Sequence, residues 1–196
     1  MKPPARGNTE GREFVVETYF SKRARTIPLT SYQKQLVIGS LLGDGTLMPT
    51  TAGFCFRVHH GVQQTEYVDW KFKVLEQFVR SAPRVSGSGY YFRTITHPEF
   101  SVLREFFYQA GRKIVPVSLL ETYLDEFGLA IWIMDDGASD GKQLRLNTQS
   151  FSQAENEELA KFLRAKFGLE VRLNNDKERN RLRFKSCNDV EARIAR

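Results

Sequence analysis

Two aspartates in nearly matching apolar segments could together hold a divalent cation. Residues 37–45 read VIGSLLGDG and residues 129–137 read LAIWIMDDG, so each segment ends in Asp-Gly, at Asp44 and at Asp136. Two carboxylates that lie close together repel each other unless a cation or a proton lies between them. Mg²⁺ prefers oxygen ligands and binds where carboxylates meet phosphates, and there it can polarise a phosphodiester. These residues could therefore support metal-assisted phosphodiester hydrolysis.

Both segments are expected to be helices that pack against each other. Gly39, Ser40 and Gly43 would let two helix backbones approach closely, and the glycine after each aspartate lets the chain turn away. One helix that ends in Asp-Gly is common, because this pair favours turns. Two apolar helices that both end in Asp-Gly are a far more specific signal than one. Ile131 occupies the position that Gly39 has in the first segment, which predicts an asymmetric interface.

The charge balance makes nucleic acid the leading partner. The 196 residues include 29 Lys and Arg against 23 Asp and Glu, which gives a net charge of +6. A basic surface attracts polyanions, with nucleic acid first and an anionic membrane second. Because 41% of the residues are hydrophobic and 12% are aromatic, the chain can bury a core, which excludes a disordered tail.

Cysteine content and hydropathy narrow the class of protein. Cys55 and Cys187 form no CxxC motif, which excludes a disulfide scaffold and a cysteine zinc site. They fit an intracellular, reducing compartment, either a bacterial or archaeal cytoplasm or an organelle matrix. No apolar run reaches the roughly 20 residues that a membrane span requires. Residues 1–30 are predicted to be a basic, mobile N-terminal arm, since their glutamates argue against a transit peptide.

Beyond this arm, one α/β pattern occurs twice. We predict a first half over residues 31–127 and a second half over residues 128–196. In each half, an apolar helix that ends in Asp-Gly precedes strands and a further helix with an apolar stripe. Capping-box patterns begin helices at Ser118 and Ser152. Predicted helices cover residues 32–42, 65–79, 98–111, 129–136 and 153–167, and predicted strands cover 54–59, 90–96, 143–149, 169–174 and 181–185.

The repeated segments resemble the two LAGLIDADG motifs of the homing endonuclease family, in its monomeric, double-motif form. The second segment, the LNTQSF sequence of residues 146–151 and residues 113–124 are similar to the mitochondrial intron-encoded omega branch. The resemblance runs from about residue 31 to residue 185. It implies an α/β (α+β) fold of pseudo-two-fold αββαββα halves, with two saddle-shaped antiparallel sheets and paired central helices.

The resemblance also implies an activity and a set of residues. The activity is Mg²⁺-dependent hydrolysis of one phosphodiester in each strand of a long double-stranded DNA site, with 3′ overhangs, at an allele that lacks the intron or intein. Mn²⁺ can substitute in the family. The metal-binding acids correspond to Asp44 and Asp136, and a catalytic helper lysine corresponds to Lys113. A second helper lysine lies in a C-terminal extension of the family beyond Arg196, so the second catalytic basic residue is left unassigned. Asp135 is expected to have a solvated or hydrogen-bonded structural role.

Alternating strand residues predict polar faces suited to DNA. In residues 181–185, for example, Leu182 and Phe184 would point inward while the residues between them point outward. Guanidinium, amide and imidazole groups bond base edges in the major groove and neutralise phosphates. The predicted DNA-binding residues are Arg57, His59, Arg93, Arg145, Asn147, Gln149, Arg172, Asn174, Arg181, Arg183 and Lys185.

Two other functions are compatible with this sequence. One is a catalytically inactive DNA-binding or regulatory protein of the same fold, and the other is an RNA maturase that assists the splicing of its host intron. The intact pair of aspartates favours an endonuclease over the first. Nothing in the sequence distinguishes an endonuclease from an RNA maturase. The chain is expected to be a monomer with no obligate protein partner and no membrane association.

The sequence also predicts where the histidines and Cys55 lie. His59, His60 and His97 have no third ligand at a useful spacing, so they are predicted to lie on the surface or in the DNA groove and not to hold a metal. Cys55 is predicted to lie on the polar side of its strand as an inert thiol.

Overall fold

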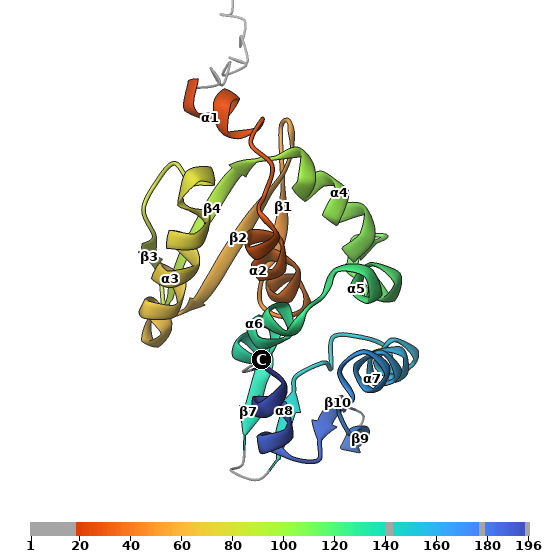
Figure 1. The fold of residues 1–196 in the computed structure, drawn as a ribbon. Coiled ribbons are helices and arrows are strands. Elements are labelled where there is room, and N and C mark those ends of the chain that lie inside the picture. The colour runs from red at the N-terminus through yellow and green to blue at the C-terminus, as the bar shows by residue number, and fades with distance from the viewer. Residues whose placement is uncertain (1–18, 140–142, 177–178, 195–196) are drawn as a thin grey trace, which may run out of the picture.

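Two helices at the centre of the molecule separate two halves that each carry a sheet (Figure 1). The computed structural model describes residues 19–139, 143–176 and 179–194. The central helices are α2 (Ser31–Leu42) and α6 (Glu126–Asp136), which contain the two segments that end in Asp-Gly. They lie side by side, as the sequence predicted.

Capping side chains stabilise the N-terminal ends of α2 and α6, and small residues let the two helices pack closely. Thr30 caps α2 in a capping box, and Asp125 caps α6 by accepting a hydrogen bond from a backbone N–H of its first turn. Such caps satisfy N–H groups that the helix itself leaves unpaired. A Cβ placed on Gly39 would lie only 2.3 Å from the carbonyl oxygen of Gly128, so the two backbones are in direct contact there. The predicted close approach is confirmed.

The first half is an antiparallel sheet in the order β1-β2-β4-β3 with helices over one face. Both α3 and α4 contact this sheet, and Phe56, Phe92 and Phe100 are buried between sheet and helices. After α2 its elements are β1 (Thr46–Thr50), β2 (Gly53–Gly61), η1 (Val62–Gln64), α3 (Thr65–Leu75), η2 (Glu76–Phe78), β3 (Arg84–Ser86), β4 (Gly89–Thr96) and α4 (Pro98–Phe107).

The second half repeats this order of elements. Its antiparallel sheet has the order β7-β8-β10-β9, and α7 packs on one face through Leu159, Phe162 and Leu163. Both halves are therefore αββαββα units, which confirms the predicted fold class. After α6 the elements are β7 (Gly137–Ser139), β8 (Leu144–Leu146), α7 (Gln153–Phe167), β9 (Val171–Asp176), β10 (Arg179–Phe184) and α8 (Cys187–Ile194).

The connection between the halves differs from the prediction. The helix expected to reach Gly111 ends at Phe107, and a small hairpin of β5 (Tyr108–Gln109) and β6 (Arg112–Lys113) follows. Its turn contains Ala110 at φ 48° and Gly111 at φ 79°, a left-handed conformation that no helix continues. The next helix, α5 (Val117–Tyr123), begins before Ser118 and has no side-chain cap, so the capping box predicted there is wrong. The box at Ser152 is confirmed.

The N-terminal region is folded over part of its predicted arm. Residues 1–18 lie outside the described residues, but α1 (Tyr19–Ala24) and the segment after it contact the first half. Ala24 and Leu29 are buried, and Arg25 donates a hydrogen bond from its Nε to the carbonyl oxygen of Thr96. Residues 19–30 therefore belong to the fold of the first half, and the prediction of a separate arm that ends at residue 30 is wrong for them.

The helices of the structure are also short in relation to a bilayer. Within residues 19–139, 143–176 and 179–194, none is long and apolar enough to cross a membrane.

Candidate active site and nucleic-acid interface

The two aspartates lie at the same end of the central helix pair. Asp44 follows α2 after Gly43, and Asp136 is the last residue of α6. A Cβ on Gly43 would lie 2.5 Å from the Cβ of Asp135, so the helix ends meet beside both aspartates. The side chain of Asp44 is 47% exposed and that of Asp136 is partly buried. The structure therefore brings together the two carboxylates that the sequence singled out.

Negative charge at this point affects Asp136 strongly. Burial raises the pKa of its carboxyl from 3.8 to about 7, and the charges of Asp44 and Asp135 act in the same direction, while Lys113 opposes them. Neighbouring anions and burial both disfavour a carboxylate. The site thus contains negative charge that a bound cation would stabilise.

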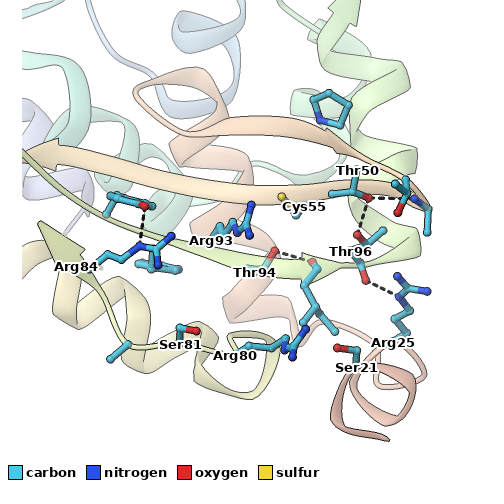
Figure 2. Close-up of a pocket in the computed structure, with 17 residues that line it drawn as sticks. Ser21, Arg25, Thr50, Cys55, Arg80, Ser81, Arg84, Arg93, Thr94 and Thr96 are labelled. Atoms are coloured by element: carbon cyan, nitrogen blue, oxygen red, sulfur yellow. Dashed lines mark hydrogen bonds between the residues drawn. The ribbon is translucent and has the colours of Figure 1, made fainter. Parts of the chain in front are cut away.

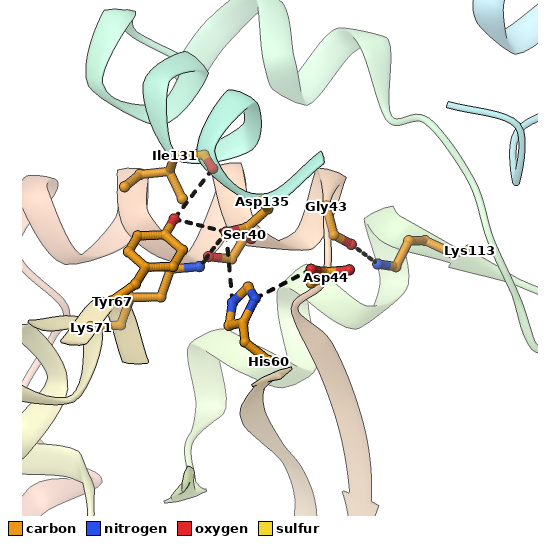
Figure 3. A network of polar contacts seen from close by, with 9 residues as sticks. All are labelled: Ser40, Gly43, Asp44, His60, Tyr67, Lys71, Lys113, Ile131 and Asp135. Carbon is orange, nitrogen blue, oxygen red and sulfur yellow. Dashed lines mark hydrogen bonds and ion pairs between the residues drawn. The ribbon is translucent and has the colours of Figure 1, made fainter. Parts of the chain in front are cut away.

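Lys113 reaches this site from β6, in the connection between the halves. Its Nζ donates a hydrogen bond of 2.9 Å to the carbonyl oxygen of Gly43 (Figure 3). A second hydrogen bond of 2.9 Å reaches the carbonyl oxygen of Gly45, on the other side of Asp44. Burial lowers the pKa of this lysine, and the nearby aspartates oppose the shift. The predicted helper lysine therefore lies beside the turn that carries Asp44.

Behind the aspartate pair lies a buried polar network around Asp135. Its side chain is fully buried, and Oδ1 accepts hydrogen bonds from Lys71 Nζ at 2.6 Å and from the Tyr67 hydroxyl at 2.7 Å (Figure 3). Lys71 is also fully buried and donates to Ser40 Oγ at 2.8 Å. Since Lys71 and Tyr67 come from α3, the network ties the first half to the end of α6. The structural role predicted for Asp135 is confirmed in its hydrogen-bonded form.

Burial shifts the pKa values of both donors in this network. Removal of Lys71 from water lowers the pKa of its ammonium group, whereas the charge of Asp135 opposes that shift. Burial and the same carboxylate raise the pKa of the Tyr67 hydroxyl, which therefore stays protonated as a donor. Both donors hold the Asp135 carboxylate in place, and the positive charge of Lys71 compensates the negative charge of Asp135.

His60 lies between the network and Asp44. Its Nδ1 is 3.3 Å from Asp44 Oδ2 and its Nε2 is 3.8 Å from Asp135 Oδ1. Neither contact is a hydrogen bond, so His60 lies beside both carboxylates without bonding to either. The ring is buried, and the prediction that His60 lies on the surface is wrong. The same prediction is wrong for His97, which is buried, caps α4 and contacts the carbonyl oxygen of Ile27.

Sequence patterns contained signals for two of these missed residues. The alternation of Phe54, Phe56 and Val58 continues inward to His60, because side chains two apart on a strand share a face. Lys71 lies three residues after Val68 in α3, within its apolar stripe. A lone charge in such a stripe indicates a buried partner, since an unpaired buried charge is costly. That partner came from the other half, which the pattern could not identify.

The protein supplies few metal ligands of its own at this site. Over the described chain, no group of three or more His, Cys, Asp and Glu side chains is arranged to hold a metal ion. Two carboxylates are nevertheless a sufficient protein contribution for Mg²⁺, which keeps several waters and takes further oxygens from phosphates. The donor set at Asp44 and Asp136 therefore fits a hard divalent cation shared with a nucleic acid.

The outward face of the first sheet carries the basic residues predicted there. Arg57 of β2 stands opposite Arg93 of β4, and the exposed His59 stands opposite Tyr91. The guanidinium of Arg57 lies 4.9 Å from the centre of the Tyr91 ring. Cys55 belongs to the same face by its position in the strand, but it is buried, and burial raises the pKa of its thiol. An inert thiol is consistent with that burial.

A row of three guanidinium groups crosses the second sheet. Arg145 of β8 pairs with Arg183 of β10, which pairs with Arg172 of β9. Opposing residues in neighbouring strands point to the same face, so the three like charges are neighbours. Arg181 and Asn174 form the adjacent row. Both predicted polar faces are therefore present.

Three predicted DNA-binding residues lie beyond the strands. The strand expected over residues 143–149 ends at Leu146, so Asn147 and Gln149 belong to the loop before α7. There the backbone N–H of Asn147 donates to the carbonyl oxygen of Asp136, which places this loop beside the aspartate. Lys185 follows β10 and forms an exposed 2.9 Å ion pair with Glu170.

Comparison with known proteins identifies a family for this chain. The model of the LAGLIDADG DNA endonuclease family matches residues 34–189. A RecA protein of Mycolicibacterium flavescens is 35% identical over 163 residues, which cover 74% of this chain and 38% of that protein. A probable intron-encoded DNA endonuclease of Mycosarcoma maydis is 34% identical over 101 residues, which cover 48% of this chain and 74% of that protein. The chain thus spans well under half of the RecA protein that it matches.

Solved structures show the same fold. The homing endonuclease I-WcaI bound to its DNA recognition sequence has a TM-score of 0.75 and 24% identity, and the match covers 89% of this chain and 82% of that one. I-DmoI in complex with DNA and Mn has a TM-score of 0.56 and 12% identity, covering 84% of this chain and 95% of that one. Together with the family match and the two Asp-Gly helices, these structures lead to one assignment: the chain belongs to the LAGLIDADG DNA endonuclease family, in its double-motif form.

Proposed function

We propose that this protein is a site-specific endonuclease that hydrolyses one phosphodiester in each strand of a long DNA duplex. The observation that carries the proposal is the meeting of Asp44 and Asp136 at one end of the α2–α6 pair, where burial, and then the charge of Asp44, raise the pKa of Asp136. The named relatives include an intron-encoded DNA endonuclease, and I-WcaI is a homing endonuclease bound to its DNA recognition sequence. Intron or intein mobility is the biological role that we propose.

The chain's own residues would divide the work of cleavage. Asp44 and Asp136 would hold Mg²⁺, or Mn²⁺ in its place, and the ion would supply charge stabilisation to the phosphodiester under attack. Lys113 would direct its ammonium group at the scissile region, with the two carbonyl oxygens at the Asp44 turn keeping it in place. The buried pair of Lys71 and Asp135 would hold the end of α6, and so the carboxylate of Asp136, in position.

The basic faces of the two sheets would bind the duplex. Arg57 and Arg93 lie on one face, and the row of Arg145, Arg183 and Arg172 lies on the other. Arginine forks bond guanine edges and phosphates in pairs, which suits both readout and positioning. Because the two faces differ in sequence, we expect one monomer to recognise an asymmetric site.

A cleavage assay with matched substitutions tests the proposal. Wild-type protein is incubated with Mg²⁺ and plasmids that carry randomised inserts, and the linear products are sequenced. Asp44→Asn and Asp136→Asn should each abolish cleavage while DNA binding persists. Asp125→Asn is the control, because asparagine also caps a helix and residue 125 lies at the opposite end of α6. The ends should carry 3′ overhangs. If wild-type protein binds DNA but never cuts it, the protein is a DNA-binding member of the family and the proposal is wrong.

A further inference from the structure

A basic cavity lies at the outer end of the first sheet, where α1 approaches β4 (Figure 2). Its volume is about 750 Å³. Four arginines contribute to its lining, and none of its lining residues within the described chain is Asp or Glu. These arginines are Arg25, Arg80, Arg84 and Arg93.

The positive charges of these side chains would attract an anion into the cavity, and a bound anion would stabilise them. The protein orders two of the four groups. Arg84 donates from Nε to the Tyr91 hydroxyl at 2.7 Å and lies over that ring, and Arg25 donates from Nε to the carbonyl oxygen of Thr96 at 3.0 Å. A built site of this charge is suited to a phosphate, since guanidinium forks match phosphate oxygens.

Hydroxyl groups add a second kind of phosphate ligand. Ser21, Ser81, Thr50 and Thr96 also line the cavity, and the hydroxyls of Thr50 and Thr96 are 2.7 Å apart. Figure 2 shows these serines and threonines around the same opening as the arginines. Contacts to DNA phosphates come mainly from Arg and Lys, together with Ser and Thr hydroxyls and backbone N–H groups.

The position of the cavity relates it to the DNA-binding face. Arg93, which lines it, stands opposite Arg57 in the sheet, so the cavity continues that face. The far end of β1 also lines it, whereas the start of β1 follows Asp44 directly. Five residues of strand span roughly 15 Å, which is about four base pairs along a duplex.

We propose that this cavity binds two neighbouring backbone phosphates of the duplex on the flank held by the first half, one contacted by Arg25 and one by Arg80, both from outside the sheet. The inference rests on the proposed DNA-binding function. Arg25 comes from the segment after α1, and Arg80 from the segment between η2 and β3. Both therefore extend the footprint beyond the strands. They add affinity and take no part in base readout or cleavage.

Salt-dependent binding tests this site. Dissociation constants for a duplex are measured in EDTA between about 50 and 200 mM salt, for wild type, Arg80→Gln and the double variant Arg25→Gln/Arg80→Gln. Each lost phosphate contact lowers the slope of log affinity against log salt by about 0.9, so the double variant should lose about 1.8. Over this range the double variant's affinity should then fall roughly tenfold less than that of wild type.

A second double variant provides the matched control. Lys73→Gln/Lys161→Gln removes the same charge from exposed positions, each in an ion pair with a glutamate three residues away in the sequence, and should leave the slope unchanged. Arg80→Gln alone, which leaves the Arg25–Thr96 contact intact, should change the slope by about 0.9. The proposal is overturned if the cavity variants and the control give the same slope.

Shortening the duplex locates the contact. On a selected cleavable site, the duplex is trimmed from either end toward the cleavage position. Trimming one end should remove the difference between wild type and the double variant, and trimming the other should preserve it. A difference that persists after both trims would place these arginines elsewhere. Single-turnover cleavage at saturating protein should match wild type, so failure of this site and failure of the nuclease proposal are distinguishable.

Discussion

At the residue scale, the proton on Asp136 would determine when the proposed site can take a cation. The folded-state pKa of about 7 exceeds the ordinary 3.8, so the group stabilises the fold when protonated, and this contribution is lost as pH rises from 3.8 through 7. A cation requires the carboxylate, so below about pH 7 its binding must displace a proton.

This linkage predicts a pH-dependent response to Mg²⁺. The rise in Tm that Mg²⁺ produces should be large near pH 8 and small near pH 6, because the apparent affinity falls by up to about tenfold for each pH unit below the pKa. Asp136→Asn should remove the pH dependence. Thermal denaturation at both pH values measures the effect, and an equal Tm rise in wild type at both would contradict the shifted pKa.

The buried ion pair of Lys71 and Asp135 gives a second prediction at this scale. Lys71→Met leaves a buried carboxylate without its counter-charge, so the free energy of unfolding should fall by about 3–5 kcal/mol. Lys71→Met/Asp135→Asn leaves no unpaired charge and should recover part of the loss. Lys73→Met, two residues along α3 and 72% exposed, is the control and should change stability little. Chemical denaturation measures all three. A loss under about 1 kcal/mol for Lys71→Met would contradict a buried ion pair between Lys71 and Asp135.

At the element scale, the contact between α2 and α6 depends on a missing side chain. Gly39→Ala would place a Cβ 2.3 Å from the Gly128 carbonyl oxygen and 2.8 Å from Ile131 Cβ, so the helices must separate. We expect a loss of about 1–3 kcal/mol in stability, and a larger fractional loss of cleavage because Asp44 and Asp136 move apart. In Gly61→Ala, the nearest atom would be Oε1 of the flexible Gln63 side chain at 3.0 Å. This control should keep both properties, whereas an unaffected Gly39→Ala would contradict the tight interface.

Local signals predicted the elements that local interactions determine. The capping box at Ser152 and the left-handed Gly168 bound α7 as predicted, since caps and C-terminal glycines act within a few residues. By contrast, β1, β7 and α8 were missed. The strands directly follow the Asp-Gly turns and are held by pairing to β2 and β8, which the pattern of a single short segment does not reveal.

In the candidate site, too, some residues could be predicted from the sequence and others could not. The paired aspartates and Lys113 followed from the motifs and the family resemblance, and the structure gathers them at one place. His60 of β2 and Lys71 of α3 also lie at this site, where both contact Asp135 at the end of α6. Their partners are determined by the way in which the halves dock, which no periodicity along one strand or helix contains.

At the scale of the whole molecule, two similar halves surround the aspartates with different neighbours. Asp44 is about half exposed, with His60 at 3.3 Å and the Lys113 contacts around its turn. Asp136 is partly buried, and its pKa is raised. A homodimer would repeat one environment twice. In this chain the two aspartates come from halves of different sequence, so their environments can differ.

If the protein cleaves both strands as proposed, its unequal carboxylates predict that the two DNA strands are not cut simultaneously. One strand should break faster than the other, so supercoiled plasmid should pass through a nicked circle before it becomes linear. Gel electrophoresis over time would show that species rise and decay, and end-labelling of each strand would identify the one cut first. Linear product that forms without a nicked circle would mean equal rates. Unequal rates would make the chain a starting point for a strand-selective nickase, reached by weakening only the slower half.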